Sequence, residues 1–366
     1  MTASTIFQPV NNAVLPSQSG EGFVLEESIQ FSGGDALIGF SASGWSSSVG
    51  EISMELWLDG QPTGGRLAIY ANQTAMHLSL GHTWVWCRDL APGQHTIALM
   101  AGPTTITDLN DRACVTVWEM GDGCAVRFTD DAPCPPGTGD VLMKYAVETS
   151  GGEQVLICAG ASGWAGSNAM VVGASVQLDG APLVSTEVFA NASGMHLATV
   201  PTAVVAAGLP RGSHAVMIEA AATTATDGGD TAHLAVVEWV DPSQAPTVLA
   251  TLENVAAQSQ SGEGQPVART TFQSSGGTLL VSVNVSGWTE GTNVPLMVGV
   301  QVDGTSLGFV EMFANPKETH MAMVSNDLVL SGVAAGPHTL TLIGEANTNT
   351  DYNDRVSVLM MEFPAG

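Results

Sequence analysis

The sequence predicts an all-β protein built from three tandem antiparallel β-sandwiches of jelly-roll type, each of about 120 residues. Three observations predict this class: an internal repeat, apolar residues that alternate with polar ones, and frequent chain breakers between the alternating runs. The 366-residue chain contains 42 glycines and 18 prolines. No segment of about ten residues shows the 3.6-residue periodicity of an amphipathic helix.

The internal repeat is clearest at a Ser-Gly-Trp triplet that ends at Trp45, Trp164 and Trp288. Successive copies lie 119 and 124 positions apart (164 − 45 and 288 − 164). The same two spacings relate Asn72/Asn191/Asn315, His77/His196/His320, His95/His214/His338, Asp108/Asp227/Asp351, Asp111/Asp230/Asp354 and Glu119/Glu238/Glu362. One register held over so many positions indicates three homologous units.

We place the three β-sandwich repeats at residues 1–122, 123–243 and 244–366. Each is near the usual size of an independent domain and is large enough to bury its own core. The joints fall near Gly121-Asp122-Gly123 and in the proline-containing segment 241–246. Because these linkers are short, neighbouring repeats should be held close together. A pseudo-threefold cluster and a short rod both fit.

Strands are indicated by alternation after each Ser-Gly-Trp triplet, as at Ile52, Met54 and Leu56. Such a period of two is typical of a half-buried β-strand. Each run ends at Asp-Gly, the strongest short hairpin signal, because glycine accepts a positive φ. These pairs are Asp59-Gly60, Asp179-Gly180 and Asp303-Gly304. Further alternating runs bring the expectation to roughly eight strands per repeat. Strand order is not written in the sequence, so an immunoglobulin-like topology is the alternative to a jelly roll.

Composition limits the classes of partner. The formal net charge is −26, from 35 acidic and 9 basic residues. Nucleic acids and anionic membranes require clustered lysine and arginine, so neither is expected as a partner. Charged residues make up 12% of the chain and apolar residues 45%, whereas a usual charged fraction is about 25%. We infer that partner subunits cover much of the surface. The alternative is an acidic, Ser/Thr/Gly-rich surface kept soluble by repulsion.

The five cysteines do not recur in the three repeats, which excludes a repeated disulfide framework. Cys124 and Cys134 are close enough in sequence to pair, but no zinc-type spacing occurs. Unmatched thiols suit a reducing compartment, or serve as small core residues. Residues 1–7 show neither the basic start nor the apolar stretch of a secretory signal, and no apolar run reaches the ~18 residues of a membrane helix.

The Asp-x-x-Asp loop of each repeat is the strongest candidate for a metal-binding site, because a histidine accompanies it at a constant spacing. One interpretation is a Ca²⁺ site, which needs six to eight oxygen ligands. The more common use of such aspartates is to accept backbone N–H bonds within a turn. No cofactor is expected. The candidate metal-binding residues are Asp108, Asp111, Asp227, Asp230, Asp351 and Asp354, beside His77, His196 and His320.

Two further recurring positions are interpreted as structural. His95, His214 and His338 follow Pro/Gly turns, where a ring nitrogen is expected to bond a loop carbonyl at the start of a strand. Glu119, Glu238 and Glu362 stand among apolar residues, which suits an acid/base group with a raised pKa. No second carboxylate is paired with them. An arginine such as Arg112 or Arg355 would pair with the carboxylate charge, which favours a structural role instead.

The tryptophans of the triplets suit two roles. Exposed aromatic rings are stacking platforms for sugars, which would make Trp45, Trp164 and Trp288 glycan ligands in a lectin-like protein. A buried tryptophan would instead plug the end of the sandwich core, with its indole N–H on a backbone carbonyl.

Catalytic motifs are missing from the sequence. It has no phosphate-binding Gly-x-x-x-x-Gly-Lys, no Gly-x-Ser-x-Gly elbow and no His-Glu-x-x-His. Three near-copies of one scaffold also argue against a single active site. The sequence therefore predicts that the protein is not an enzyme.

The overall pattern resembles the tandem jelly-roll or sandwich domains of tailed-phage virion surface proteins, including capsid decoration, collar and tail-fibre components. The residues that carry the likeness are the Val/Leu-Asp-Gly hairpin, the Asn-rich step after it, the Gly/Pro-His strand entry at His95 and His338, and the final Val-x-Val-x-Glu strand. The same features occur in carbohydrate-binding modules, and fold likeness does not establish function.

The resemblance implies a non-enzymatic structural protein of a virion or phage-like particle, assembled in the host cytoplasm. Its expected partners are other copies of itself or neighbouring particle proteins. The alternative is a lectin-like, receptor-binding protein that recognises glycans with its repeated tryptophans. A third interpretation, a calcium-dependent adhesin, is supported by the Asp-x-x-Asp loops alone.

Overall fold

A computed structural model describes residues 6–121, 123–152, 154–261 and 263–363. Within these ranges the chain is almost entirely strands, with a single short 3-10 helix, η1 (Pro242–Gln244), at the joint between the second and third repeats. Asp122 of the first joint and residues 1–5 of the N-terminal segment lie outside the described residues. No helix in the described part of the chain is long and apolar enough to span a membrane.

The first repeat forms two four-stranded antiparallel sheets, in the orders β1-β10-β4-β7 and β3-β8-β5-β6. When the eight longer strands are numbered one to eight along the chain, one sheet has the order 1-8-3-6 and the other has the order 2-7-4-5. This is the double Greek key of a jelly roll, not an immunoglobulin-like order. The strands are β1 (Ile6–Val14), β3 (Gly22–Phe31), β4 (Gly34–Gly44), β5 (Gly50–Leu58), β6 (Gln61–Ala71), β7 (Leu78–Leu90), β8 (Gly93–Ala101) and β10 (Arg112–Glu119), with the short pair β2 (Gln18–Ser19) and β9 (Ile106–Thr107).

The second repeat has the same topology. One sheet contains β11-β21-β14 with β18 paired to β14, and the other has the order β13-β19-β15-β16. The strands are β11 (Cys124–Pro133), β12 (Gly137–Thr138), β13 (Val141–Thr149), β14 (Gln154–Ala165), β15 (Met170–Leu178), β16 (Ala181–Ala190), β17 (Leu197–Ala198), β18 (Thr202–Ala207), β19 (Gly212–Ala220), β20 (Thr224–Thr226) and β21 (Thr231–Trp239).

The third repeat contains β22-β32-β25 with β29 paired to β25, and a second sheet in the order β24-β30-β26-β27. The prediction of three tandem antiparallel sandwiches is confirmed. The strands are β22 (Thr247–Ala256), β23 (Gln260–Ser261), β24 (Gln265–Ser274), β25 (Thr278–Gly287), β26 (Val294–Val302), β27 (Thr305–Ala314), β28 (Met321–Ala322), β29 (Asn326–Leu330), β30 (Gly336–Gly344), β31 (Asn349–Thr350) and β32 (Arg355–Phe363).

Local sequence explains the hairpins and the sandwich cores. Ile52, Met54 and Leu56 alternate along β5 and are fully buried. Asp59 and Gly60 then turn the chain into β6 with φ values of 50° and 73°. Two successive left-handed residues match the right-handed twist of the flanking strands, which is why Asp-Gly is favoured there.

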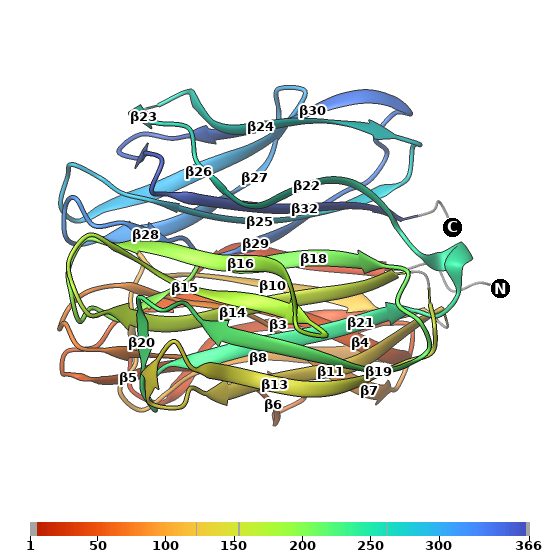
Figure 1. The fold of residues 1–366 in the computed structure, drawn as a ribbon, viewed down its shortest axis with the longest axis horizontal. Helices are drawn as coiled ribbons and strands as arrows, with labels where there is room; N and C mark the ends of the chain where they lie inside the picture. Colours follow the sequence, from red (N-terminus) through yellow and green to blue (C-terminus); the bar gives the residue numbers. More distant parts are fainter. Residues whose placement is uncertain (1–5, 122, 153, 262, 364–366) are drawn as a thin grey trace.

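The three sandwiches close into a ring rather than a rod. Strand β29 of the third repeat contacts β1 and β10 of the first, β7 of the first contacts β11 and β21 of the second, and β18 of the second contacts β22 and β32 of the third. Equivalent strands therefore meet at all three contacts, which is the condition for closed cyclic symmetry. Figure 1 shows the third repeat (blue) lying over the other two, with strands running along the long direction of the molecule.

A shared apolar core lies where the three repeats meet. Trp118, Trp239 and Phe363, one from the last strand of each repeat, are buried there. Trp118 packs against Trp239 with ring centroids 5.8 Å apart and against Phe363 at 5.5 Å. The last strands are thus buried on both faces, which agrees with their nearly continuous apolar sequences. Part of the charge-poor surface inferred from composition is covered by the neighbouring repeats of the same chain.

The cysteines form no disulfide among the described residues. All five thiols are free, so Cys124 and Cys134 do not pair. Burial raises the pKa of Cys87 to about 11, which makes it an unreactive core thiol.

Candidate functional site

A pocket of about 310 Å³ lies between the first and third repeats and brings together two sets of recurring residues. The first repeat contributes the triplet tryptophan and part of the Asp-x-x-Asp loop, and the third repeat contributes an aromatic ring and two amides. The pocket is lined by Trp45, His77 and Asp108 of the first repeat and by Asn293, Phe313 and Asn315 of the third.

The Asp-x-x-Asp loop is a hydrogen-bonded turn. Asp108 Oδ1 accepts the N–H of Asn110 at 2.8 Å, and Asp111 Oδ2 accepts the N–H of Asp108 at 2.9 Å. This is the turn bonding expected of such aspartates. Asp111 Oδ1 also accepts the Ser43 hydroxyl and lies 2.9 Å from His77 Nδ1. Asp111 is fully buried, so both of its oxygens are engaged inside the protein.

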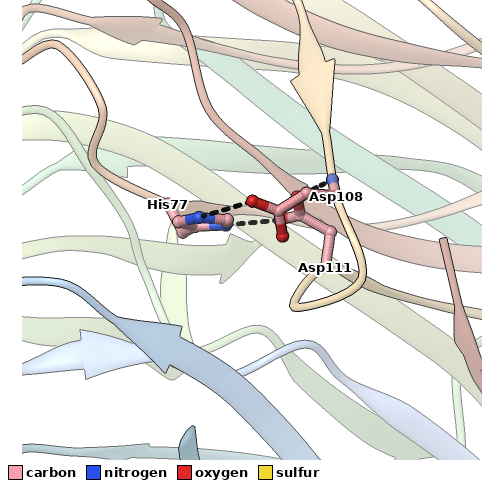
Figure 2. Close-up of side chains that lie close together, drawn as sticks. All are labelled: His77, Asp108 and Asp111. Atoms are coloured by element: carbon pink, nitrogen blue, oxygen red, sulfur yellow. Dashed lines mark hydrogen bonds and ion pairs between the residues drawn. The ribbon is translucent and has the colours of Figure 1, made fainter. Parts of the chain in front are cut away.

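His77 faces the two carboxylates of this loop, one with each ring nitrogen (Figure 2). Its Nδ1 faces Asp111, whereas its Nε2 is 3.7 Å from Asp108 Oδ2. That separation is too long for a hydrogen bond. The His77 side chain is 4% exposed and Asp108 is 32% exposed. One edge of the imidazole is therefore fixed by the protein, and the other faces the pocket beside a half-exposed carboxylate.

The neighbouring repeat holds the histidine in place. The backbone N–H of His77 donates to Asn315 Oδ1 at 2.8 Å, and Phe313 packs edge-on against its ring. In the next interface His320 donates to Asn191 Oδ1 at 3.0 Å, and Phe189 takes the place of Phe313. At these two interfaces the recurring asparagine of one repeat thus accepts from the histidine of a neighbouring repeat.

The interface between the second and first repeats varies this arrangement. Tyr70 packs edge-on against His196, with ring centroids 5.2 Å apart. The Asn72 side-chain amide donates to the carbonyl of Gly194 rather than accepting from the histidine. Each interface therefore combines a histidine and two aspartates of one repeat with an aromatic residue and an asparagine of another.

The triplet tryptophans stand beside the histidines. Trp45, Trp164 and Trp288 are half-buried, with ring centroids 6.0, 6.2 and 6.0 Å from His77, His196 and His320, respectively. Their indole Nε1 atoms are buried and have no hydrogen-bond partner among the described residues. The expectation that the indole N–H bonds a backbone carbonyl is therefore wrong, because the backbone of the triplet pairs with its neighbour strand and the ring turns toward the histidine.

The second set of histidines behaves as expected. His95 Nε2 lies 2.8 Å from the carbonyl of Ala91, and Nδ1 lies 2.6 Å from Asp59 Oδ2. His214 and His338 make the same two contacts in their repeats. Both partners are acceptors, so the two contacts favour the protonated ring. The hydrogen bonds to Ala91 and Asp59 raise the pKa of His95.

The recurring glutamates bind Ser-Gly-Gly turns. Burial alone would raise the pKa of Glu362, but hydrogen bonds from Ser274, Ser275 and Gly277 lower it to about 2. Hydrogen bonds also lower the pKa of Glu238 against the effect of burial. The hypothesis of an acid/base group with a raised pKa is therefore wrong for these two glutamates.

Arg112 and Arg355 are not the partners of these glutamates. Their guanidinium groups bind Glu311 and Glu187 of neighbouring repeats. Sequence reasoning missed both glutamates because the equivalent position in the first repeat is Ala68. The arginine and the glutamate each recur in two of the three repeats, and this partial recurrence was the available signal.

No protein-family model and no curated protein sequence matches the chain. Among solved structures, PNGF-II is similar with a TM-score of 0.34 at 7% identity, over 89% of this chain and 99% of that chain. A structure described as the triple jelly-roll fold and turret assembly in an archaeal virus has a TM-score of 0.22 at 11% identity, over 100% and 91%.

Carbohydrate-binding domains are also among the similar structures. The CBM36-1 domain of a multidomain xylanase from the hindgut metagenome of Trinervitermes trinervoides has a TM-score of 0.20 at 16% identity, over 34% of this chain and 92% of that chain. These TM-scores are too low to support an argument about function.

Proposed function

We propose that the chain is a non-enzymatic structural protein of a virion or phage-like particle, which assembles with other copies of itself or with neighbouring particle proteins. The supporting observation is the closure of three jelly rolls around one apolar core, in which Trp118, Trp239 and Phe363 meet. Such a body is rigid and presents three equivalent sides, which suits packing into a symmetric lattice. The charge-poor composition fits a surface made for protein contacts.

Exposed apolar side chains on equivalent loops are candidates for these contacts. Leu109 is 67% exposed and Tyr352 is 73% exposed, at matching positions of the Asp-x-x-Asp loops of the first and third repeats. Gly228 stands at this position in the second repeat. Aromatic side chains such as that of Tyr352 are enriched where proteins contact one another.

Light scattering of the purified chain at micromolar concentration, with electron microscopy of any particles, tests this proposal. We expect assembly of the wild-type chain, and loss of assembly at unchanged melting temperature in the double variant Leu109→Ser/Tyr352→Ser. Val141→Ser is the matched control, because Val141 is also an exposed apolar residue but lies on β13. A chain that stays monomeric and does not associate with particles would contradict the proposal.

A second candidate function is glycan binding, because the pocket pairs the indole of Trp45 with the polar side chains of Asp108 and Asn315. An aromatic surface beside a few placed polar groups is typical of small-ligand sites. If the site binds sugar, the substitutions Trp45→Ala, Trp164→Ala and Trp288→Ala should abolish a glycan-array signal at unchanged melting temperature. Array binding that survives the triple substitution would exclude this role for the tryptophans.

A further inference from the structure

The three interfaces between repeats share a pair of atoms that the turn bonding does not explain. His77 Nε2 and Asp108 Oδ2 face each other at 3.7 Å. The same two atoms of His196 and Asp227 are 4.0 Å apart, and those of His320 and Asp351 are 3.9 Å apart. The gap recurs with little variation in three repeats whose sequences have diverged.

The chemistry of the two atoms makes the gap informative. Asp111 Oδ1 accepts the Ser43 hydroxyl and faces His77 Nδ1, so the ring tautomer with its proton on Nδ1 satisfies this contact. Nε2 then presents a lone pair to the pocket. Asp108 Oδ2 is also an electron-pair donor. When Nε2 carries no proton, these two electron-pair donors form a cradle for a cation or for a double hydrogen-bond donor.

We propose that each interface between repeats binds one divalent transition-metal ion of the zinc class, between the histidine Nε2 and the first aspartate of the Asp-x-x-Asp loop. Imidazole nitrogen with carboxylate oxygen is a ligand set that zinc accepts. Two zinc ligands at tetrahedral angles lie about 3.4 Å apart, so a closure of a few tenths of an ångström brings His77 and Asp108 into position.

The second aspartate fits the outer shell of such a site. A metal-bound histidine usually donates its other ring N–H to a carboxylate, which fixes the ring and increases its basicity. Asp111 is placed to do this for His77, and Asp230 and Asp354 do the same in the other repeats, each at 2.8 Å. Calcium fits less well, because it needs six to eight oxygens and those of Asp111 are already engaged.

The pocket gives the ion access and open positions. The His77 side chain is 4% exposed and lines the pocket beside Trp45 and Asp108. Two protein ligands leave the remaining coordination positions to water or to a ligand in the pocket. Phe313 packs against the histidine ring, and the His77 backbone N–H donates to Asn315 Oδ1. The site is therefore complete only when the ring of repeats is closed.

Titration of the chelator-treated full chain with Zn²⁺ and with Co²⁺ tests the proposal, by calorimetry and by the visible absorption of bound Co²⁺. We expect three ions per chain. Asp108→Asn keeps the oxygen that accepts the Asn110 N–H but removes the charge, and should abolish one equivalent. The triple variant with Asp227→Asn and Asp351→Asn should abolish all three.

Asp59→Asn is the matched control, because Asp59 also pairs with a histidine but the other nitrogen of that ring is bonded to Ala91. It should leave three equivalents. Absence of binding at millimolar metal, or full binding by the folded triple variant, would overturn the proposal. The outcome is independent of particle assembly, which is scored by light scattering in the presence and absence of chelator.

Discussion

Arg112 of the first repeat and Glu311 of the third form a two-pronged ion pair across their interface. The Nε–Oε2 distance is 2.9 Å and the second guanidinium contact is 3.0 Å. At the same two positions between the second and first repeats stand Thr231 and Ala68, and the Thr231 hydroxyl donates to the Ala68 carbonyl at 2.6 Å. Equivalent positions at two interfaces of the ring are therefore joined by chemically different contacts.

Removing one partner of the ion pair should destabilise the chain. Both side chains are largely buried, with 16% exposure for Arg112 and 6% for Glu311. The substitution Arg112→Thr leaves Glu311 without its partner, and we expect a loss of about 3 kcal/mol in the free energy of unfolding, measured in urea.

The second repeat supplies the control for this experiment. Arg112→Thr combined with Glu311→Ala copies the pair formed by Thr231 and Ala68. It should recover a large part of the loss, because no buried charge is left unpaired. Additive losses in the double-mutant cycle would contradict a direct coupling of the two side chains.

Truncation at the shared core should be severe. Trp118 is fully buried between Trp239 and Phe363, so Trp118→Ala should cost about 3–5 kcal/mol of unfolding free energy through lost burial and a cavity. Trp57→Ala serves as a control, because Trp57 is half-buried and lies on β5. Equal losses for the two variants would argue against the shared core.

Stability should fall as the pH rises through the titration of three histidines. Hydrogen bonds raise the pKa of His95, His214 and His338 above the ordinary value of 6.5. Their stabilisation is complete below pH 6.5, the unfolded-state value, and is lost as the pH rises through the higher folded-state pKa. Urea unfolding on both sides of this range measures the change.

The control is the triple variant in which these histidines are replaced by glutamine. Its stability should depend less on pH in the same range. His82 remains in both proteins and has the opposite sign, because burial lowers its pKa and the cost of charging it appears as the pH falls below 6.5. A variant with the full wild-type loss at high pH would rule out the three histidines as its source.

Acid should weaken the turn held by Glu362. Its pKa is lowered from 4.5 to about 2, so its stabilisation is present above pH 4.5 and is lost as the pH falls toward the folded-state value. Glu362→Gln places an amide donor among backbone N–H groups, and we expect a loss of about 1–3 kcal/mol at neutral pH. The difference from wild type should shrink in acid; a constant difference would contradict this assignment.

The three-unit organisation, the strands and their hairpins can be predicted from the amino-acid sequence, because they depend on local rules. Alternation at Ile52, Met54 and Leu56 sets which face of β5 is buried, and Asp59-Gly60 sets the turn. Strand order did not follow from such rules, since a jelly roll and an immunoglobulin-like sandwich use the same alternation.

The closed ring and the composition of the candidate site depend instead on contacts between residues far apart in the sequence. Asn315 meets the backbone of His77 across 238 positions of sequence, and Arg112 meets Glu311 across 199. The internal repeat singled out His77 and Asn315, but it did not show that Asn315 of the third repeat accepts a hydrogen bond from His77 of the first. That assignment depends on how rigid sandwiches dock, and docking is set by side chains such as Trp118 whose partners lie in other repeats.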